Sequence, residues 1–120
     1  KMINVRLSKC GGFRNSLKII DYLRTNGILF QIGCQLGESG ILSAAGRALC
    51  LLCGDAVYYD GSYDEFMLKE NKTFENVSFG PGGQAGPLKN PGLGVKVSPQ
   101  HLKNICNESE TILLSNLKSL

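Results

Sequence analysis

The feature that most constrains this chain is its opening run, residues 2–12, in which apolar and polar side chains alternate before a glycine pair. Such alternation with period two is typical of a β-strand. The rows are Ile3, Val5 and Leu7 on one side and Asn4, Arg6 and Ser8 on the other. In a barrel of parallel strands the outward row packs on helices, and inward residues near the carboxyl ends reach the substrate side. We therefore interpret this run as a barrel strand with an apolar outer face.

Helical and strand-like patterns alternate after the opening run. Leucines and isoleucines recur at helical spacing up to residue 26, with Asn15 or Ser16 as the N-cap and Gly27 as the left-handed residue after the helix. Residues 28–34 and 56–60 predict two further strands, and residues 41–53 predict an apolar helix between them. Because the connections are short, the order predicts right-handed βαβ units and a parallel sheet.

The remainder of the chain changes character. Residues 79–94 are rich in glycine and proline, which predicts turns rather than long regular elements. Ser98 and Pro99 begin a short helix, and the apolar spacing of residues 108–120 predicts a terminal helix. We expect one domain over residues 1–98, followed by a helical tail over residues 99–120.

Composition excludes several classes of function. The apolar content of 42% is ordinary for a globular domain, and no apolar run reaches the roughly 20 residues that cross a bilayer. The opening residues lack the apolar region of a signal peptide, so we expect a cytoplasmic protein. A net charge of +3 with scattered basic residues does not indicate nucleic-acid binding. The odd number of cysteines, five, favours reduced thiols, and the Cys50/Cys53 spacing favours packing over a redox or zinc site.

Three parallel strands with two intervening helices leave both sheet edges open and little covered core. We therefore expect the chain to be part of a longer polypeptide or to complete its sheet with another chain. A small free-standing α/β binding module is the remaining alternative, and it predicts a cooperative monomeric unfolding transition.

Four blocks of the sequence, in order, resemble the enolase superfamily in its mandelate-racemase and muconate-lactonizing branch. The resemblance covers residues 2–98. The blocks are residues 3–12 (sixth barrel strand), residues 33–45 (seventh strand, loop and helix), residues 58–62 (end of the eighth strand) and residues 91–95 (closing segment).

The resemblance implies an α/β fold, a partial (β/α)8 barrel made of strands six to eight with their helices, a Gly/Pro-rich closing segment and a terminal helix. It also implies a capping domain, a small carboxylate substrate, and Mg²⁺ bound by carboxylates of the third, fourth and fifth strands, with a second-strand lysine as the base. None of those strands lies in this chain. The expected partners are therefore the remainder of the barrel and the capping domain, or a complementary chain, and neither nucleic acid nor a membrane.

Arg6 stands at the position of the family's sixth-strand lysine, the second acid/base, and is our candidate catalytic residue. Arginine stays protonated in proteins, so it cannot serve as a base. A guanidinium there can stabilise an enediolate or hold a carboxylate of the substrate, which predicts one-base chemistry: dehydration, syn elimination or cycloisomerisation. The alternative is that Arg6 only pairs with a barrel carboxylate.

Gln35, Glu38 and Asp60 are the candidate substrate-binding residues, and we predict no metal ligand in the chain. Gln35 and Glu38 follow the seventh strand, on the side where barrel active sites form. Asp60 matches a position where some dipeptide epimerases read an amino group, but Tyr58 leaves the paired-acid pattern incomplete. Glu38 could instead bond a neighbour, and Asp60 could instead support a turn.

The sequence thus predicts the carboxyl-terminal part of an enzyme that removes a proton next to a carboxylate with metal assistance, dehydratase-like or cycloisomerase-like, and inactive as an isolated chain. The alternative is a non-catalytic remnant or partner subunit.

Overall fold

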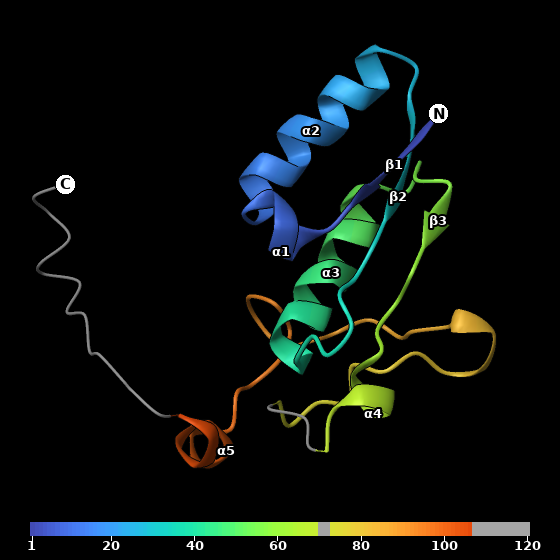
Figure 1. The fold of residues 1–120 in the computed structure, drawn as a ribbon. Helices are drawn as coiled ribbons and strands as arrows, with labels where there is room; N and C mark the ends of the chain where they lie inside the picture. Colours follow the sequence, from blue (N-terminus) through green and yellow to red (C-terminus); the bar gives the residue numbers. More distant parts are fainter. Residues whose placement is uncertain (70–72, 107–120) are drawn as a thin grey trace, which may run out of the picture.

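A computed structural model describes residues 1–69 and 73–106 of the chain. The main elements are three strands, β1 (Met2–Val5), β2 (Leu29–Ile32) and β3 (Tyr58–Tyr59), and two long helices, α2 (Phe13–Thr25) and α3 (Gly40–Leu52). The strands form one sheet in the order β1-β2-β3, and both pairs of neighbours are parallel. The predicted alternation of strands and helices in a parallel sheet is confirmed (Figure 1).

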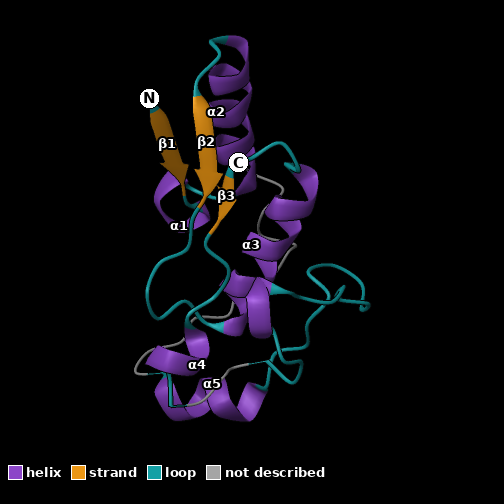
Figure 2. Cartoon of the chain, turned by 90° about the vertical axis from the view of Figure 1, so that its right-hand side faces the viewer, coloured by secondary structure: helices purple, strands orange, loops and turns teal. Residues whose placement is uncertain are grey.

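Both long helices lie on the same side of the sheet (Figure 2). The core fills the space between them and the sheet, because the apolar stripe of each helix faces the buried row of the strands. Its members are Val5, Leu7, Ile20, Leu23, Phe30, Ile32, Ala45, Leu49 and Cys53. Gly27 follows Asn26, the C-cap of α2, and adopts a φ of 63°, as predicted, which turns the chain back into β2.

The opening strand is shorter than predicted. It ends at Val5, and the next residues form a single helical turn, α1 (Leu7–Cys10). The backbone N–H groups of Lys9 and Cys10 donate to the Arg6 carbonyl oxygen, at 3.0 and 2.9 Å. The prediction was wrong here because Leu7 is buried in the helical turn just as it would be in a strand, so the apolar period alone does not separate the two.

The second helix also begins earlier than predicted, at Phe13, with Gly12 as its N-cap. Ser16, one of the two predicted caps, lies inside the helix and is fully buried. Two consecutive glycines with positive φ, Gly11 and Gly12, are the only residues between α1 and α2, and they let the chain turn from one helix into the other.

Short elements dominate after β3, as the glycine and proline content predicts: α4 (Asp64–Met67), the 3-10 turn η1 (Pro81–Gly83) and α5 (Pro99–Ile105). The predicted start of α5 is confirmed, because the Ser98 hydroxyl accepts a hydrogen bond from the His101 N–H and Pro99 occupies the first turn. The predicted terminal helix over residues 108–120 lies outside the described residues.

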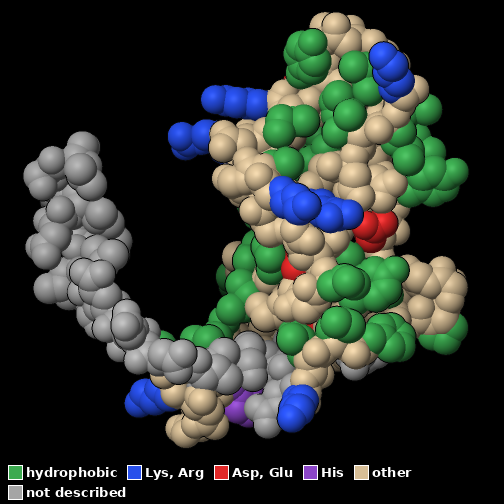
Figure 3. All heavy atoms as spheres, in the orientation of Figure 1, with side chains coloured by type: hydrophobic (Ala, Val, Ile, Leu, Met, Phe, Trp, Pro, Cys, Tyr) green, Lys and Arg blue, Asp and Glu red, His purple; other side chains and the backbone are tan. Residues whose placement is uncertain are grey.

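Both outer strands of the sheet expose apolar side chains. Figure 3 shows hydrophobic side chains spread over the upper part of the molecule, where Figure 1 places the sheet. Met2 and Ile3 on β1, and Tyr58 and Tyr59 on β3, are between 42% and 61% exposed. Each of the outer strands also has one backbone edge that pairs with no other strand of the sheet. Among residues 1–69 and 73–106, no helix has the length and apolar character needed to cross a membrane.

Candidate functional site

The candidate site residues lie at one edge of the sheet because the three strands are parallel. Arg6 follows β1, residues 33–39 form the loop after β2, and Asp60 follows β3 directly. Side chains that follow the carboxyl ends of neighbouring parallel strands meet at the same edge. The structure therefore brings together the four residues that the sequence singled out.

Arg6 sits at the junction between β1 and α1 in extended conformation, with φ −123° and ψ 124°. Its guanidinium Nη1 donates to the Gln35 side-chain oxygen at 3.5 Å. The Arg6 Nε is buried and has no partner among the described residues. A protonated guanidinium is a donor only, so this group can bind an anionic or carbonyl oxygen and cannot accept a proton.

Asp60 is held across the sheet by donors from the neighbouring strand and loop. Its Oδ1 accepts a hydrogen bond from Gln31 Nε2 at 2.9 Å, and its Oδ2 accepts one from the Cys34 backbone N–H at 3.3 Å. The Asp60 backbone N–H donates to the Ile32 carbonyl at 3.0 Å, which extends the sheet by one bond. The carboxylate is therefore fixed beside the start of the loop that carries Gln35.

Glu38 is the most buried of the four candidates, with 8% of its surface exposed. Its Oε1 accepts hydrogen bonds from the Gln35 backbone N–H at 2.7 Å and from the Ser8 hydroxyl at 3.3 Å. The carboxylate thus bonds its own loop and also α1. Gln35 contacts two of the other candidates: its backbone N–H donates to Glu38, and its side-chain oxygen accepts from Arg6.

Cys34 belongs to the same site, and the sequence reasoning missed it. Burial raises the pKa of the Cys34 thiol, the charges of Asp60 and Glu38 raise it further, and Arg6 opposes them. The thiol therefore lies where the fields of all three charged candidates meet. The signal that could have found it is its position, since Cys34 is the last residue of the run predicted as the second strand.

The described residues do not fit a magnesium site. They contain no group of three or more His, Cys, Asp or Glu side chains that could hold a metal ion. The nearby carboxylates are engaged otherwise, because Asp60 and Glu38 accept hydrogen bonds from N–H and O–H donors. The described residues therefore supply no complete set of ligands for a metal ion.

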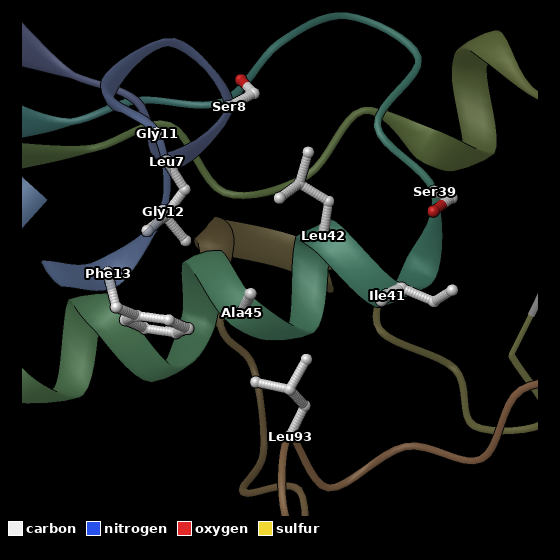
Figure 4. Close-up of a pocket in the computed structure, with 10 residues that line it drawn as sticks. All are labelled: Leu7, Ser8, Gly11, Gly12, Phe13, Ser39, Ile41, Leu42, Ala45 and Leu93. Carbon is white, nitrogen blue, oxygen red and sulfur yellow. The ribbon is translucent and has the colours of Figure 1, made fainter. Parts of the chain in front are cut away.

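An apolar cavity of about 520 Å³ lies beside the site, between α1 and the first turns of α3 (Figure 4). Its lining residues are Leu7, Ser8, Gly11, Gly12, Phe13, Ser39, Ile41, Leu42, Ala45 and Leu93. Ser8 borders this cavity and also donates to Glu38. The cavity itself contains none of the four candidate residues.

Cys50 on α3 and Cys53, which caps its end, are packing residues. Cys50 and Cys53 form no disulfide with each other, and Cys53 is fully buried. Burial, reinforced by the neighbouring Cys53, raises the pKa of the Cys50 thiol to about 11. A thiol with such a pKa carries almost no thiolate at neutral pH, which is unlike a reactive redox pair.

Comparisons with known proteins agree with this architecture. A hydrophobic dipeptide epimerase from Roseobacter litoralis is 40% identical over 47 residues, which are 39% of this chain and 13% of that protein. The crystal structure of a dipeptide epimerase from Cytophaga hutchinsonii, complexed with Mg and the dipeptide D-Ala-L-Val, superposes with a TM-score of 0.72 at 25% identity. The match covers 84% of this chain and 27% of that structure, so the chain spans about a quarter of this relative.

The model of the enolase C-terminal domain-like family matches residues 1–101, which include β1, β2, β3 and the candidate site residues. These residues form the parallel sheet, the two long helices on one of its faces, and the polar residues that follow the strands. The chain belongs to the enolase C-terminal domain-like family.

Proposed function

We propose that this chain forms strands six to eight of the barrel of an enolase-superfamily enzyme, which removes a proton next to a substrate carboxylate with metal assistance. The family match, the open edges of the sheet and the 27% coverage of the solved relative support this assignment. The magnesium ligands, the first base and the capping domain then come from polypeptide outside residues 1–120. What this chain supplies is one wall of the substrate site.

The observation that carries the proposal is the guanidinium of Arg6 at the carboxyl end of β1. It lies beside Gln35 and keeps an unpartnered, buried Nε among the described residues. A permanent cation with free donor capacity stabilises negative charge that develops on a carboxylate as the neighbouring proton leaves. Since Arg6 cannot take a proton, the reaction uses one base, as in a dehydratase or a cycloisomerase.

The second candidate is an epimerase of dipeptides. Both relatives described above carry that name, and Asp60 offers a carboxylate that two N–H donors hold at the end of β3. Such a carboxylate can accept a hydrogen bond from the ammonium group of a peptide substrate. Epimerisation requires a proton donor on the opposite face, however, so a group other than Arg6 would have to supply it.

The test uses the complete protein and the variant Arg6→Lys. The proton next to the carboxylate of D- and L-configured test substrates is followed by NMR in deuterated buffer. We expect the native protein to exchange one configuration, and the lysine variant to exchange both, because lysine can act as a base. Unchanged exchange in the variant would show that position 6 is not an acid/base position.

Two controls separate the remaining alternatives. The isolated chain should show no turnover, and robust magnesium-dependent exchange by it would refute the proposal. In the coding region upstream, an in-frame Lys-x-Lys with spaced acidic strand ends is expected of an enzyme. A stop codon there would favour the non-catalytic remnant or partner subunit.

A further inference from the structure

We infer that Glu38 is a positioning residue, which orients Arg6 through Gln35 and does not itself contact substrate. The inference rests on the proposed function, in which Arg6 meets the reacting carboxylate. It assigns to Glu38 a different role from that of Gln35 and Asp60.

The burial of Glu38 is the first argument. The residue is 8% exposed, while Arg6, Gln35 and Asp60 are each half-buried. Its Oε1 is also occupied, because it accepts hydrogen bonds from the Gln35 N–H and the Ser8 hydroxyl. A substrate group that reached this oxygen would have to displace a charge-assisted bond of 2.7 Å to the backbone.

The second argument is that Glu38 connects the two segments that hold Arg6 in place. Through Ser8 it is bonded to α1, and the carbonyl of Arg6 accepts the N–H groups of Lys9 and Cys10 in that same turn. Through Gln35 it is bonded to the loop after β2. Arg6 and Ser8 therefore belong to one short hydrogen-bonded unit, and Glu38 sets its position against the loop.

Gln35 transmits this constraint to the guanidinium. Its backbone N–H is fixed by Glu38, and its side-chain oxygen accepts the Arg6 Nη1 at 3.5 Å. The Arg6 Nε has no partner among the described residues, so this contact with Gln35 is what orients the end of the side chain. If Glu38 is removed, the N–H of Gln35 loses its acceptor, the loop relaxes and Arg6 loses its orientation.

The test compares Glu38→Ala, Glu38→Gln and Gln35→Ala in the full chain, labelled with ¹⁵N. Two NMR signals are followed: hydrogen exchange of the backbone amide at position 35, and the chemical shift of the Arg6 Nε–H. We expect Glu38→Ala to speed exchange about tenfold and to shift the Arg6 signal, because a bond to a charged acceptor is lost. Glu38→Gln retains an oxygen acceptor and should leave both signals close to those of the native chain.

Gln35→Ala should shift the Arg6 signal while the amide at position 35 stays protected, since only the side-chain contact is removed. Asp60→Asn is the matched control: it changes a carboxylate of the same site, and it should leave the Arg6 signal in place. If Glu38→Ala prevents folding, the pair of Glu38→Gln and Gln35→Ala decides the question.

An unchanged Arg6 signal in Glu38→Ala or in Gln35→Ala would overturn the inference, and so would a Glu38→Gln variant that perturbs both signals. These NMR signals do not depend on turnover. The test of Glu38 can therefore fail while the deuterium exchange test of Arg6→Lys succeeds, and it can succeed while that test fails. In an active complete protein, Glu38→Ala should lower kcat and Glu38→Gln should restore it, whereas loss of a substrate contact would mainly raise KM.

Discussion

The carboxamide of Asn4 fills the space in which a side chain at Gly33 would lie. A Cβ built on Gly33 would stand 1.9 Å from Asn4 Oδ1, far inside van der Waals contact. Asn4 is on β1 and Gly33 directly follows β2, and the Gly33 N–H donates to the Val5 carbonyl at 2.8 Å. The two residues lie on the face of the sheet opposite the core, where the side chains alternate with Val5 and Ile32.

Gly33→Ala should force the exposed Asn4 side chain into another rotamer and so destabilise the chain by about 0.5–1.5 kcal/mol. Denaturant unfolding measures the effect. In the double variant Asn4→Ala/Gly33→Ala the space is available, so the cost of the second substitution should fall well below its cost alone. Additive effects of the two substitutions would contradict the steric explanation.

Arg47 anchors the Gly/Pro-rich segment to α3, and its loss should loosen that segment. The guanidinium donates to the carbonyl oxygens of Gly86 and Val77 and lies 5.1 Å from the centre of the Phe79 ring. Arg47→Met keeps the apolar stem but leaves both carbonyls without this donor, so we expect a loss of about 2–3 kcal/mol. Hydrogen exchange should accelerate in residues 77–88. Arg14→Met, at an exposed position of α2, is the control and should change neither measurement.

The ion pair of Arg24 and Asp55 should make stability depend on pH. Arg24 Nε donates to Asp55 Oδ2 at 2.8 Å, and this contact lowers the pKa of the Asp55 carboxyl. A carboxyl group with a lowered pKa in the folded state stabilises above its ordinary pKa and loses this effect as the pH falls through the folded value. Asp55→Asn should therefore lower Tm at pH 7 and have little effect at about pH 2.

Added salt should weaken the effect of Asp55→Asn, because both side chains are partly exposed. Asp21→Asn is the matched control. It removes the second acidic partner of Arg24, whose carboxylate lies 3.3 Å from the guanidinium and whose side chain is 72% exposed. It should therefore change Tm less than Asp55→Asn does. An equal effect of Asp55→Asn at both pH values would contradict the assignment.

The reactivity of Cys34 should report the charges of the candidate site. Burial and then the charges of Asp60 and Glu38 raise the pKa of the thiol, while Arg6 lowers it. Asp60→Asn and Glu38→Gln should therefore move the pH profile of alkylation to lower pH, and Arg6→Gln should move it to higher pH. Iodoacetamide labelling with peptide mass mapping separates Cys34 from the other thiols. An Asp60→Asn profile identical to that of the native chain would contradict this electrostatic arrangement.

Much of the fold could be predicted because its signals are local. Neighbouring residues suffice to predict the strands around Phe30 and Tyr58 and the end of α2 before Gly27. They also suffice to predict that α5 begins after Ser98. The end of the first strand could not be predicted in this way. Leu7 is buried whether it belongs to a strand or to a turn of helix, so its burial does not distinguish the two structures. The helical turn is identified by the Arg6 carbonyl oxygen, which accepts hydrogen bonds from two backbone N–H groups.

The candidate site shows the same division. The sequence allowed four candidates to be proposed because each follows a strand-like run, namely Arg6, Gln35, Glu38 and Asp60. The carboxyl ends of parallel strands lie at one edge of the sheet. That Arg6, Gln35 and Asp60 are catalytic or substrate-binding residues stays a prediction, whereas our inference gives Glu38 a positioning role. The role of Cys34 was missed, since its thiol gains its electrostatic environment from residues on three different segments.

The sequence alone therefore determined the order of the three strands and the two long helices, the parallel sheet, and the kinds of side chain at its carboxyl edge. Periodicity, glycines and caps act within a few residues of the chain, and they are legible without a structure. Tertiary structure decided that Glu38 is turned inward to bond Gln35 and Ser8, that Arg47 holds distant carbonyls, and that Asn4 occupies the space over Gly33. Apart from the bond between Gln35 and Glu38, these contacts join residues far apart in the chain, and they form only when the segments pack against one another.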